Sequence, residues 1–284
     1  MSRFSSRRDF LCLSAAVAGG AMLGMQRRVW GEDKAEEFPG FKLGIQSYSL
    51  RGYGVDEAIK HAGEIGFTTI EFFGGHYPLE STDEQITQMN EKLASAKLEI
   101  TAHGVNGFGA DHAANKKVFD FAKRAGIKNI SADPSPDSFD SLDKLVAEYD
   151  IRIAIHNHGP SHRYDKAIDV LNAVKNHHPH IGACADLGHY IRSGEDPVAV
   201  IRLLKGRLFG IHLKDFAEQK AQTKGVILGR GHMDVVGVFK ALKEADFPID
   251  GGLSLEYEEN PDNPLDDIRE CFAIATDAAK QVRA

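Results

Sequence analysis

From residue 38 onward, short apolar runs alternate with segments of helical periodicity, and this alternation constrains the fold more than any other feature of the sequence. Apolar runs of strand length begin near residues 43, 68, 98, 127, 151, 181, 207 and 252. Helical segments follow them at 55–65, 82–96, 116–125, 141–148, 166–175, 197–204, 234–245 and 264–282. This order of elements predicts parallel strands joined by helices.

The number of strand–helix units selects one α/β architecture. Eight units over about 245 residues match a (β/α)8 TIM barrel, which typically has about 250 residues. An open doubly wound sheet would carry a glycine-rich phosphate loop after its first strand, and the sequence there is SYSLRGYGVD. We therefore predict a single-domain TIM barrel over residues 38–284, with a long loop at 215–233 after the seventh strand.

The first 31 residues differ in character from the rest of the chain. A basic start (Arg3, Arg7, Arg8) precedes a weakly apolar run from Phe10 to Met25, shorter than the roughly 20 residues of a transmembrane helix. The string SRRDFL at 6–11 resembles a twin-arginine export signal. We expect a signal peptide at 1–31, a charged spacer at 32–37, and a periplasmic protein without a stable membrane span after cleavage. An ordinary amphipathic helix is the alternative.

Charge and cysteine content exclude several classes of protein. The chain has a net charge of −7, and loss of residues 1–31 removes five Arg and one Asp, which makes it more acidic. Nucleic-acid binding needs clustered Lys and Arg, so we expect no nucleic-acid partner. Three cysteines are too few for a disulfide framework. Twin-arginine export often delivers folded proteins with a metal or cofactor already bound, and a homo-oligomer is left open.

Strand parity predicts a metal site. Side chains alternate across a strand, so one set lines the barrel and the other packs on helices. This parity puts His156, Asp186, His212 and Glu256 inside at matching places on four consecutive strands, at the C-terminal ends where such barrels hold their active sites. Two imidazoles and two carboxylates suit Mn²⁺, Co²⁺, Zn²⁺ or Mg²⁺. A hydrogen-bonded polar plug is the alternative.

Further polar residues are expected around the same mouth. Parity also places His158 and Lys214 inside, and His189 follows the sixth strand. We expect four strand-end residues to bind substrate, and two residues of the long loop to close over it: Gln46, Glu71, His103 and Asp133, with Arg230 and His232. A mouth this polar suits a hydroxyl-rich small molecule, so we predict a carbohydrate substrate.

The motifs at these positions resemble the xylose isomerase-like barrels called sugar phosphate isomerases/epimerases, over nearly all of residues 40–284. The resemblance depends on GIQSYSLR (44–51), GFTTIEFFG (66–74), AIHNHGP (154–160), ADLGHYIRSGEDP (185–197), IHLKD (211–215), LGRGHMD (228–234) and LSLEYE (253–258). The family includes ketose 3-epimerases, hydroxypyruvate isomerase, inosose-processing enzymes, relatives that cleave 3-keto-glycosides by elimination, and zinc endonucleases for abasic DNA.

The resemblance also implies site residues. In the epimerases the metal is held by Glu, Asp, His and Glu on strands five to eight, and Asp186, His212 and Glu256 match three of these positions. His156 stands where the epimerases have the first Glu. Because those enzymes use both glutamates as an acid/base pair, one on each face of the substrate, the single Glu256 argues against symmetric epimerisation. It permits one-base isomerisation, or an elimination helped by a histidine.

The first hypothesis is therefore a divalent-metal-dependent isomerase or epimerase that acts on a keto-sugar through an enediolate. Glu256 would be the base, His158, His103 or His189 would relay a proton, and Lys214 would stabilise the oxyanion. The first alternative is a metal-dependent lyase or hydrolase of 3-keto-glycosides acting by β-elimination. The second is a non-catalytic sugar-binding barrel. An endonuclease is disfavoured by the charge, the predicted export and Arg230-Gly231-His232 in place of a zinc-binding Asp-x-His.

Overall fold

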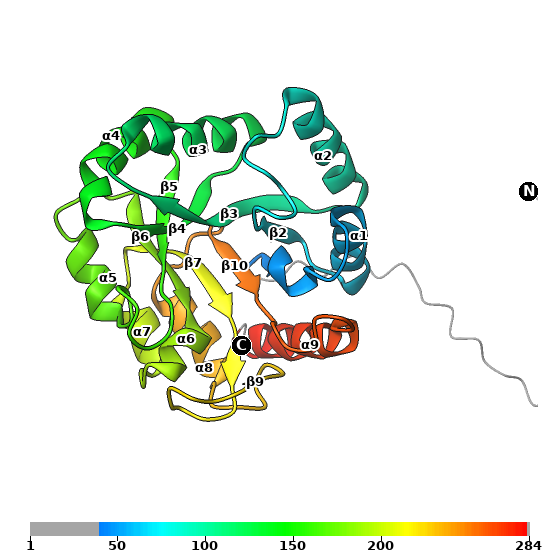
Figure 1. The fold of residues 1–284 in the computed structure, drawn as a ribbon. Helices are drawn as coiled ribbons and strands as arrows, with labels where there is room; N and C mark the ends of the chain where they lie inside the picture. Colours follow the sequence, from blue (N-terminus) through cyan, green and yellow to red (C-terminus); the bar gives the residue numbers. More distant parts are fainter. Residues whose placement is uncertain (1–39, 283–284) are drawn as a thin grey trace, which may run out of the picture. The chain divides into compact units, whose positions relative to one another are not determined.

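Eight parallel strands close into a barrel in the computed structural model, which describes residues 40–282. The order around the ring is β1-β10-β7-β6-β5-β4-β3-β2, and Figure 1 shows the helices arranged around these strands. All described residues belong to one compact unit. The predicted fold class, a single (β/α)8 TIM barrel, is confirmed. The predicted signal peptide at 1–31 and spacer at 32–37 lie outside the described residues.

The elements follow the predicted rhythm closely. The barrel strands are β1 (Leu43–Gln46), β2 (Thr69–Phe72), β3 (Glu99–Phe108), β4 (Asn129–Pro134), β5 (Arg152–His156), β6 (Ile181–Asp186), β7 (Leu208–Leu213) and β10 (Gly252–Leu255). The α-helices are α1 (Val55–Ile65), α2 (Asp83–Ser95), α3 (His112–Ala125), α4 (Phe139–Tyr149), α5 (Ala167–Val174), α6 (Leu187–Arg192), α7 (Pro197–Leu203), α8 (Val235–Glu244) and α9 (Leu265–Gln281). Short 3₁₀ helices η1 (Ser47–Leu50) and η2 (Pro136–Ser138) follow β1 and β4. The sequence pattern did not predict α6, which is only six residues long.

Local signals set the helix ends. The side chain of Thr82 accepts a hydrogen bond from the backbone N–H of Gln85, whose own side chain accepts from the Thr82 N–H, and this capping box starts α2. Asp111 caps α3 through the N–H groups of Ala113 and Ala114. Helix α1 ends at Gly66, whose φ of 112° lies in the left-handed region that favours glycine. Short, capped helices of this kind return the chain to the next parallel strand.

The strand register places the ends of β6, β7 and β10 side by side. Asp186 pairs with His212, and Ser254 pairs with His212 from the other side. The outward side chains, such as Ile153 and Ile155, are fully buried against the helices. The inward side chains just below the strand ends are small, which leaves room for longer polar groups above them.

One irregularity changes the parity of β3. The β2–β3 pairing shifts between Ile70 and Glu71, so that Glu71 pairs with Ala102 rather than with Thr101. After a bulge, every following side chain points to the opposite face of the sheet. His103 therefore points outward and packs 5.2 Å from the ring of Phe121 on α3. The prediction that His103 faces the barrel interior is wrong.

The long loop after β7 contains a small hairpin. Strands β8 (Asp215–Phe216) and β9 (Gly225–Val226) pair antiparallel. The carboxylate of Asp215 then accepts hydrogen bonds from four backbone N–H groups of the following turn: Gly229, Gly231, His232 and Met233. One buried side chain thus organises a loop that the sequence pattern left undefined.

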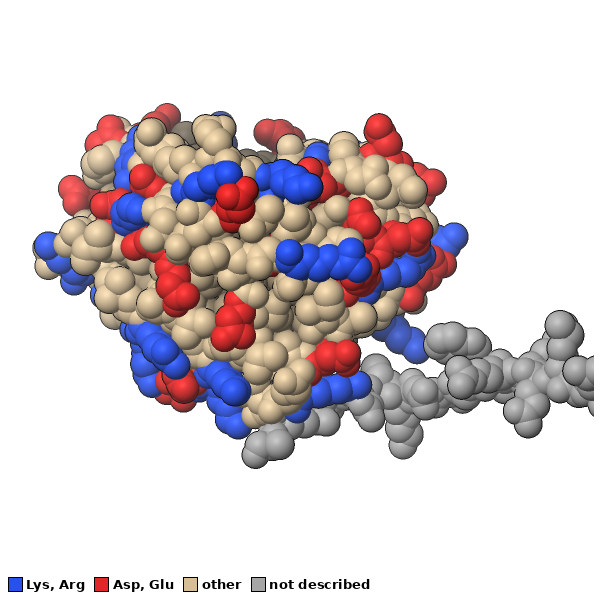
Figure 2. Space-filling model, turned by 90° about the horizontal axis from the view of Figure 1, so that it is seen from below, with Lys and Arg blue, Asp and Glu red and all other residues tan. Residues whose placement is uncertain are grey.

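The outer surface is mixed in charge where it can be seen. On the face shown in Figure 2, acidic and basic side chains are interspersed rather than gathered by sign. Within residues 40–282, none of the helices combines the length and the apolar character that crossing a bilayer requires.

Candidate metal centre and active site

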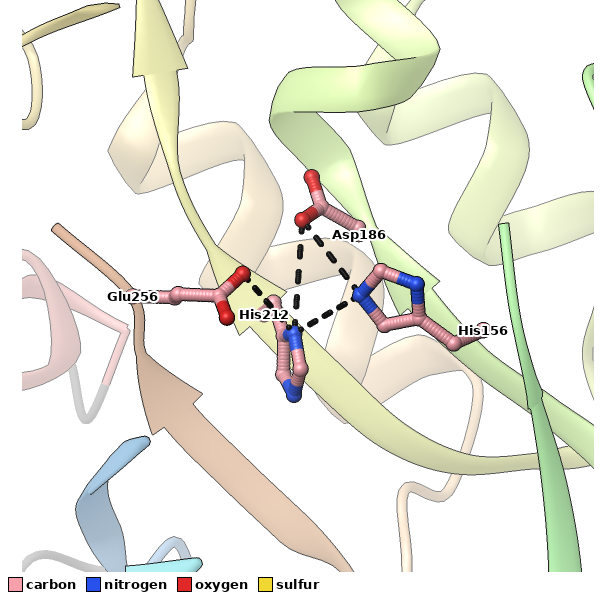
Figure 3. A group of neighbouring side chains, drawn as sticks. All are labelled: His156, Asp186, His212 and Glu256. Carbon is pink, nitrogen blue, oxygen red and sulfur yellow. Dashed lines mark hydrogen bonds and ion pairs between the residues drawn. The ribbon is translucent and has the colours of Figure 1, made fainter. Parts of the chain in front are cut away.

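Four side chains converge at the C-terminal end of the barrel. One ligand atom from each of His156, Asp186, His212 and Glu256 lies within 4.8 Å of all the others. Nδ1 of His212 is 3.1 Å from Nε2 of His156 and 3.1 Å from Oε2 of Glu256. Figure 3 shows the four groups pointing toward one another from separate strands. The structure therefore brings together the four residues that strand parity selected.

The donor set fits a divalent cation. Metal–ligand bonds of about 2.0–2.2 Å put neighbouring ligand atoms roughly 3–4 Å apart, and Oδ2 of Asp186 lies 3.6 Å from Nε2 of His156 and 4.0 Å from Nδ1 of His212. Among the described residues this buried Oδ2 has no hydrogen bond of acceptable geometry, although Nζ of Lys214 lies 3.0 Å away. A buried carboxylate oxygen that accepts no hydrogen bond is costly. A cation held by these four residues would satisfy this one.

Lys214 is the counter-ion of the cluster. Its Nζ lies 2.6 Å from Oε2 of Glu256 and 3.1 Å from Oε1 of Glu258. Burial would lower the pKa of Lys214, but Asp186 and Glu256 outweigh it and hold the pKa above its usual value. Burial would likewise raise the pKa of Glu256, and Lys214 and His212 hold it below its usual value. The cluster therefore holds an ammonium group beside ionised carboxylates.

Glu71 lies behind His212, away from the mouth. Its Oε2 accepts a hydrogen bond from Nε2 of His212 at 3.0 Å and from Oγ of Ser254 at 3.0 Å, and its Oε1 accepts from Oγ of Ser131 at 2.5 Å. Burial would raise the pKa of Glu71, but His212 outweighs it and brings the pKa below its usual value. The side chain is fully buried. The prediction that Glu71 binds substrate is therefore wrong, because His212 stands between it and the cavity.

Asn157 fixes the backbone at Asp186. Its side-chain amide donates to the carbonyl oxygen of Asp186 at 3.0 Å, and its Oδ1 accepts from the N–H of Asp186 at 2.7 Å. Asp186 is also the N-cap of α6, because its Oδ1 accepts from the N–H of His189 at 2.7 Å. These bonds orient Oδ2 toward the other three ligands.

Two imidazoles form the opposite side of the site. The rings of His158 and His189 are 5.8 Å apart and stacked, and each lies near the ring of His156. Burial lowers the pKa of His158 to about 4, with a further contribution from His156. Burial also lowers the pKa of His189, to about 3. Both rings are thus neutral in the structure described here.

A cavity of about 680 Å³, including the solvent at its mouth, opens above the four-residue cluster. Its lining includes the titratable side chains of His156, His158, His189, Lys214, Glu256 and Glu258. The other lining residues are Gln46, Tyr48, Phe73, Gly74, Gly104 and Val105. Tyr48 and Val105 are unusually exposed for large apolar residues, at 38% and 42%. The predicted site residues Gln46, His158, His189 and Lys214 therefore share one cavity with the cluster.

The remaining predicted substrate-binding residues lie elsewhere. Arg230 forms an ion pair with Glu270 on α9 and does not line the cavity, and its closure over the substrate stays a prediction. His232 is exposed and does not line the cavity. Asp133 sits near the rim, where Oδ2 lies 3.4 Å from Nε2 of His162. The loop at 229–233 is held by Asp215 instead of folding over the mouth.

Two residues with positioning roles were not predicted from the sequence. Asn157 lies between His156 and His158, and its outward position carried no signal of the bonds to Asp186. Asp215 follows Lys214 in the sequence, and its carboxylate accepts hydrogen bonds from backbone N–H groups of the loop at 229–233. In both cases a side chain forms hydrogen bonds with backbone groups that are distant in the sequence. Sequence periodicity does not predict such contacts.

Comparison with known families agrees with this geometry. Residues 59–274 match the family described as xylose isomerase-like TIM barrel. The chain belongs to this family. Within it, the xylose isomerase-like barrel described here resembles inosose dehydratase of Clostridium botulinum (strain Eklund 17B / Type B), with 31% identity over 143 residues. These residues are 44% of this chain and 47% of the relative. A second inosose dehydratase, from C. botulinum (strain Alaska E43 / Type E3), is 29% identical over 66% of this chain and 68% of its own length.

The chain thus spans about half the length of the first of these relatives and about two thirds of the second.

Solved structures share the fold of this xylose isomerase-like barrel. The IOLI protein with a bound zinc atom superposes with a TM-score of 0.70 at 16% identity, over 85% of this chain and 99% of that one. An L-ribulose 3-epimerase superposes with a TM-score of 0.69 at 14% identity, over 86% and 96%.

Proposed function

We propose that the protein is a metal-dependent lyase that removes the proton beside the ketone of a keto-cyclitol or keto-glycoside and expels an oxygen substituent from the next carbon. The observation that supports it best is the one-sided distribution of carboxylates. Both carboxylates that line the cavity, Glu256 and Glu258, follow β10 and contact Lys214. The facing side, from β5 and α6, offers the imidazoles of His158 and His189.

This distribution suits elimination better than epimerisation. Epimerisation at carbon needs a base on one face of the substrate and an acid on the other, and the second glutamate of the epimerases is His156 here. Elimination can use one face only. The inosose dehydratase relatives act, by their name, as dehydratases of a keto-cyclitol, which is the same class of reaction.

The site residues have distinct roles in this proposal. A divalent cation held by His156, Asp186, His212 and Glu256 would polarise the ketone as a Lewis acid when bound. Both contacts of Glu256 are made by Oε2, so Oε1 is the oxygen that takes the proton from carbon. The ammonium of Lys214 stabilises the negative charge that develops on the substrate oxygen.

The bond changes balance without a further reactant. The C–H bond beside the ketone breaks and its proton passes to Glu256. The electron pair forms a carbon–carbon double bond, and the C–O bond at the next carbon breaks. Glu256 returns the proton to the departing oxygen on the same face, which releases water from a cyclitol or an alcohol from a glycoside. His158 and His189 hold the hydroxyl groups of the substrate by hydrogen bonds.

Isomerisation or epimerisation of a keto-sugar is the second candidate. It is favoured by Asp186, His212 and Glu256, which occupy three of the four positions that resemble the epimerase metal site. Both reactions begin with the same proton removal, so they differ only in whether a C–O bond breaks.

The test is a product analysis in D₂O with purified, metal-loaded protein. An inosose and a series of 3-keto-glycosides would be followed by NMR. Lyase activity predicts an unsaturated ketone together with released water or alcohol. Deuterium incorporation with the substituents retained would instead establish the isomerase. Unchanged substrate, with neither an elimination product nor exchange at any carbon, would exclude both reactions and leave a sugar-binding barrel.

We also propose that the protein is exported through the twin-arginine pathway to the periplasm. The support is the sequence at 6–11 and the apolar run after it. The test is cell fractionation with mass measurement of the mature N-terminus. Replacement of Arg7 and Arg8 by Lys should retain the uncleaved chain in the cytoplasm, and periplasmic accumulation of that variant would contradict the proposal.

A further inference from the structure

We infer that Glu71 is a positioning residue for the metal site: its carboxylate orients His212 and sets the affinity for a divalent cation without contacting cation or substrate. This inference rests on the metal dependence proposed above. It assigns a role to a residue on β2, on the far side of the barrel ring from the ligand strands β5 and β6.

The hydrogen bond between the two side chains fixes the orientation of the imidazole. An ionised carboxylate can only accept hydrogen bonds, so Nε2 of His212 carries the proton that it donates to Oε2 of Glu71 at 3.0 Å. In a neutral imidazole this leaves Nδ1 with its lone pair. Nδ1 is the atom that faces His156 and Glu256, each at 3.1 Å. The hydrogen bond to Glu71 thus engages Nε2 and leaves Nδ1 as the ring nitrogen that faces the proposed cation site.

Glu71 is itself held from two sides. The hydroxyl of Ser131 on β4 donates to Oε1 of Glu71, and the hydroxyl of Ser254 on β10 donates to Oε2. Both serines are at most 1% exposed and Glu71 is fully buried. A carboxylate with three donors in a packed interior has one position, so the imidazole that donates to it is also fixed. Such supporting partners of metal-bound histidines typically change metal affinity 10–100-fold when mutated.

Charge supports the same role. The carboxylates of Glu71, Asp186 and Glu256 are all at most 7% exposed. Lys214 supplies one compensating charge. A divalent cation would supply the other two and leave His212 neutral, so the buried charges would sum to zero. Buried ions are stable only when they are paired in this way.

The experiment compares divalent-metal affinity and metal-free stability in three variants of the full mature protein. Glu71→Gln keeps the size of the side chain and an acceptor for His212 but removes the charge. We expect its affinity for Zn²⁺ and Mn²⁺, measured by competition with a chelating dye, to fall about 10–100-fold. Its melting temperature without metal should stay within a few degrees of wild type, because the unfilled site loses a surplus negative charge.

Two further variants separate positioning from simple charge or packing. Glu258→Gln removes a carboxylate that contacts Lys214 but not His212, so its metal affinity should fall by less than threefold. Ser254→Ala removes one donor to Glu71 and should weaken metal binding several-fold with Glu71 still present. The absorption spectrum of the Co²⁺-loaded protein should change in Glu71→Gln and not in Glu258→Gln, because only the first alters a ligand's orientation.

The outcomes distinguish this inference from the proposed function. Wild-type protein that binds no divalent cation would overturn both. If the wild type binds metal, two results would overturn the role of Glu71 alone. One is a metal affinity of Glu71→Gln within twofold of wild type, and the other is an equal loss of metal affinity in Glu258→Gln. If Glu71→Gln did not fold, the Ser254→Ala result would decide: unchanged metal affinity would overturn the inference.

Discussion

Nζ of Lys214 lies 2.6 Å from Oε2 of Glu256, in a cluster where both side chains are less than 10% exposed. Removal of one partner of a buried ion pair leaves the other uncompensated, at a cost of about 3–5 kcal/mol. We expect Lys214→Met to lose stability of this order without metal and to regain part of it when a divalent cation is added. Urea unfolding with and without chelator would measure both effects.

Lys220→Met is the matched control for that variant. Lys220 pairs with Glu218 at the surface, where both side chains are more than half exposed, and exposed pairs contribute about 0–1 kcal/mol. A Lys214→Met protein as stable as Lys220→Met under both conditions would show that the ammonium group does not compensate the carboxylates.

Replacement of Glu256 should remove catalysis. Transfer of a proton by a positioned side chain accelerates reactions about 10²–10⁴-fold, so Glu256→Gln should lower kcat by this factor on any accepted keto-substrate. Glu258→Gln should have a much smaller effect, because its Oε1 contacts Lys214 from the exposed rim. Deuterium exchange at the carbon beside the ketone is the measurement, and exchange at the wild-type rate in Glu256→Gln would assign the base elsewhere.

The ligand set predicts metal preference. Imidazole nitrogen favours Zn²⁺ and Co²⁺, whereas carboxylate oxygen favours Mn²⁺ and Mg²⁺. The wild-type site, with His156 and His212, should therefore prefer Zn²⁺ or Co²⁺ over Mg²⁺, and His156→Glu should shift the preference toward Mn²⁺ and Mg²⁺. Competition between metals, followed by elemental analysis of the dialysed proteins, would measure it. An unchanged order of preference in the variant would mean that His156 does not contact the cation.

Asp215 should stabilise the loop that follows it. Its carboxylate accepts from the N–H groups of Gly229, Gly231, His232 and Met233, and hydrogen bonds to a charged group contribute about 1.5–3 kcal/mol. Asp215→Ala should cost about 2 kcal/mol or more, with faster amide hydrogen exchange confined to residues 229–233. Amide hydrogen exchange at 229–233 as slow as in wild type would contradict this role. The control is Asp234→Ala, which removes only the N-cap of α8.

A pH-dependent contribution is expected at the other end of the barrel. Nη1 of Arg152 lies 2.8 Å from Oδ1 of Asp250; burial would raise the pKa of Asp250, but Arg152 outweighs it and holds the pKa below its usual value. A carboxyl with a lowered folded pKa stabilises the fold above its unfolded pKa of about 3.9, and this is lost as pH falls through the folded pKa.

Arg152→Gln should therefore lower the free energy of unfolding by about 1 kcal/mol at pH 7, as expected for a partly exposed pair. The difference from wild type should shrink in acid. Urea titrations at neutral pH and at the lowest pH where both proteins stay folded would show it, and a difference that is independent of pH would assign the effect to packing of Arg152 alone.

Strand parity predicted the ligand cluster because the strand ends that carry the ligands are in register: Asp186 pairs with His212 beyond the shift between Ala183 and Cys184, and Ser254 pairs with His212 on the other side. His156, Asp186, His212 and Glu256 are separated by long stretches of sequence, yet they meet within 4.8 Å. The same rule failed on β3, where the register shift beside Glu71 turned His103 outward. A bulge changes parity without a change in composition, so the sequence pattern could not reveal it.

Loop contacts were less predictable than strand faces. Arg230 was expected over the substrate, but it pairs with Glu270, and the loop around it follows the backbone contacts of Asp215. Glu71 was correctly placed inside the barrel, but its depth relative to His212 depends on the tilt of strands across the ring. Sequence periodicity predicts which face of a strand a side chain occupies. It does not predict how far along the barrel axis that side chain lies relative to side chains of other strands.

The hydrogen bond between Glu71 and His212 joins residues 141 positions apart in the chain. The shorter way around the ring from β2 to β7 passes through β1 and β10, and Ser254 of β10 also donates to Glu71, so this arrangement depends on the last strand having joined the first. Contacts of such long sequence separation form late, after most of the chain entropy has been lost. A folding intermediate made of adjacent strands could bring His156, Asp186 and His212 near one another, but their final orientation would wait for ring closure. Uptake of metal with native affinity would then mark the completion of folding rather than its start.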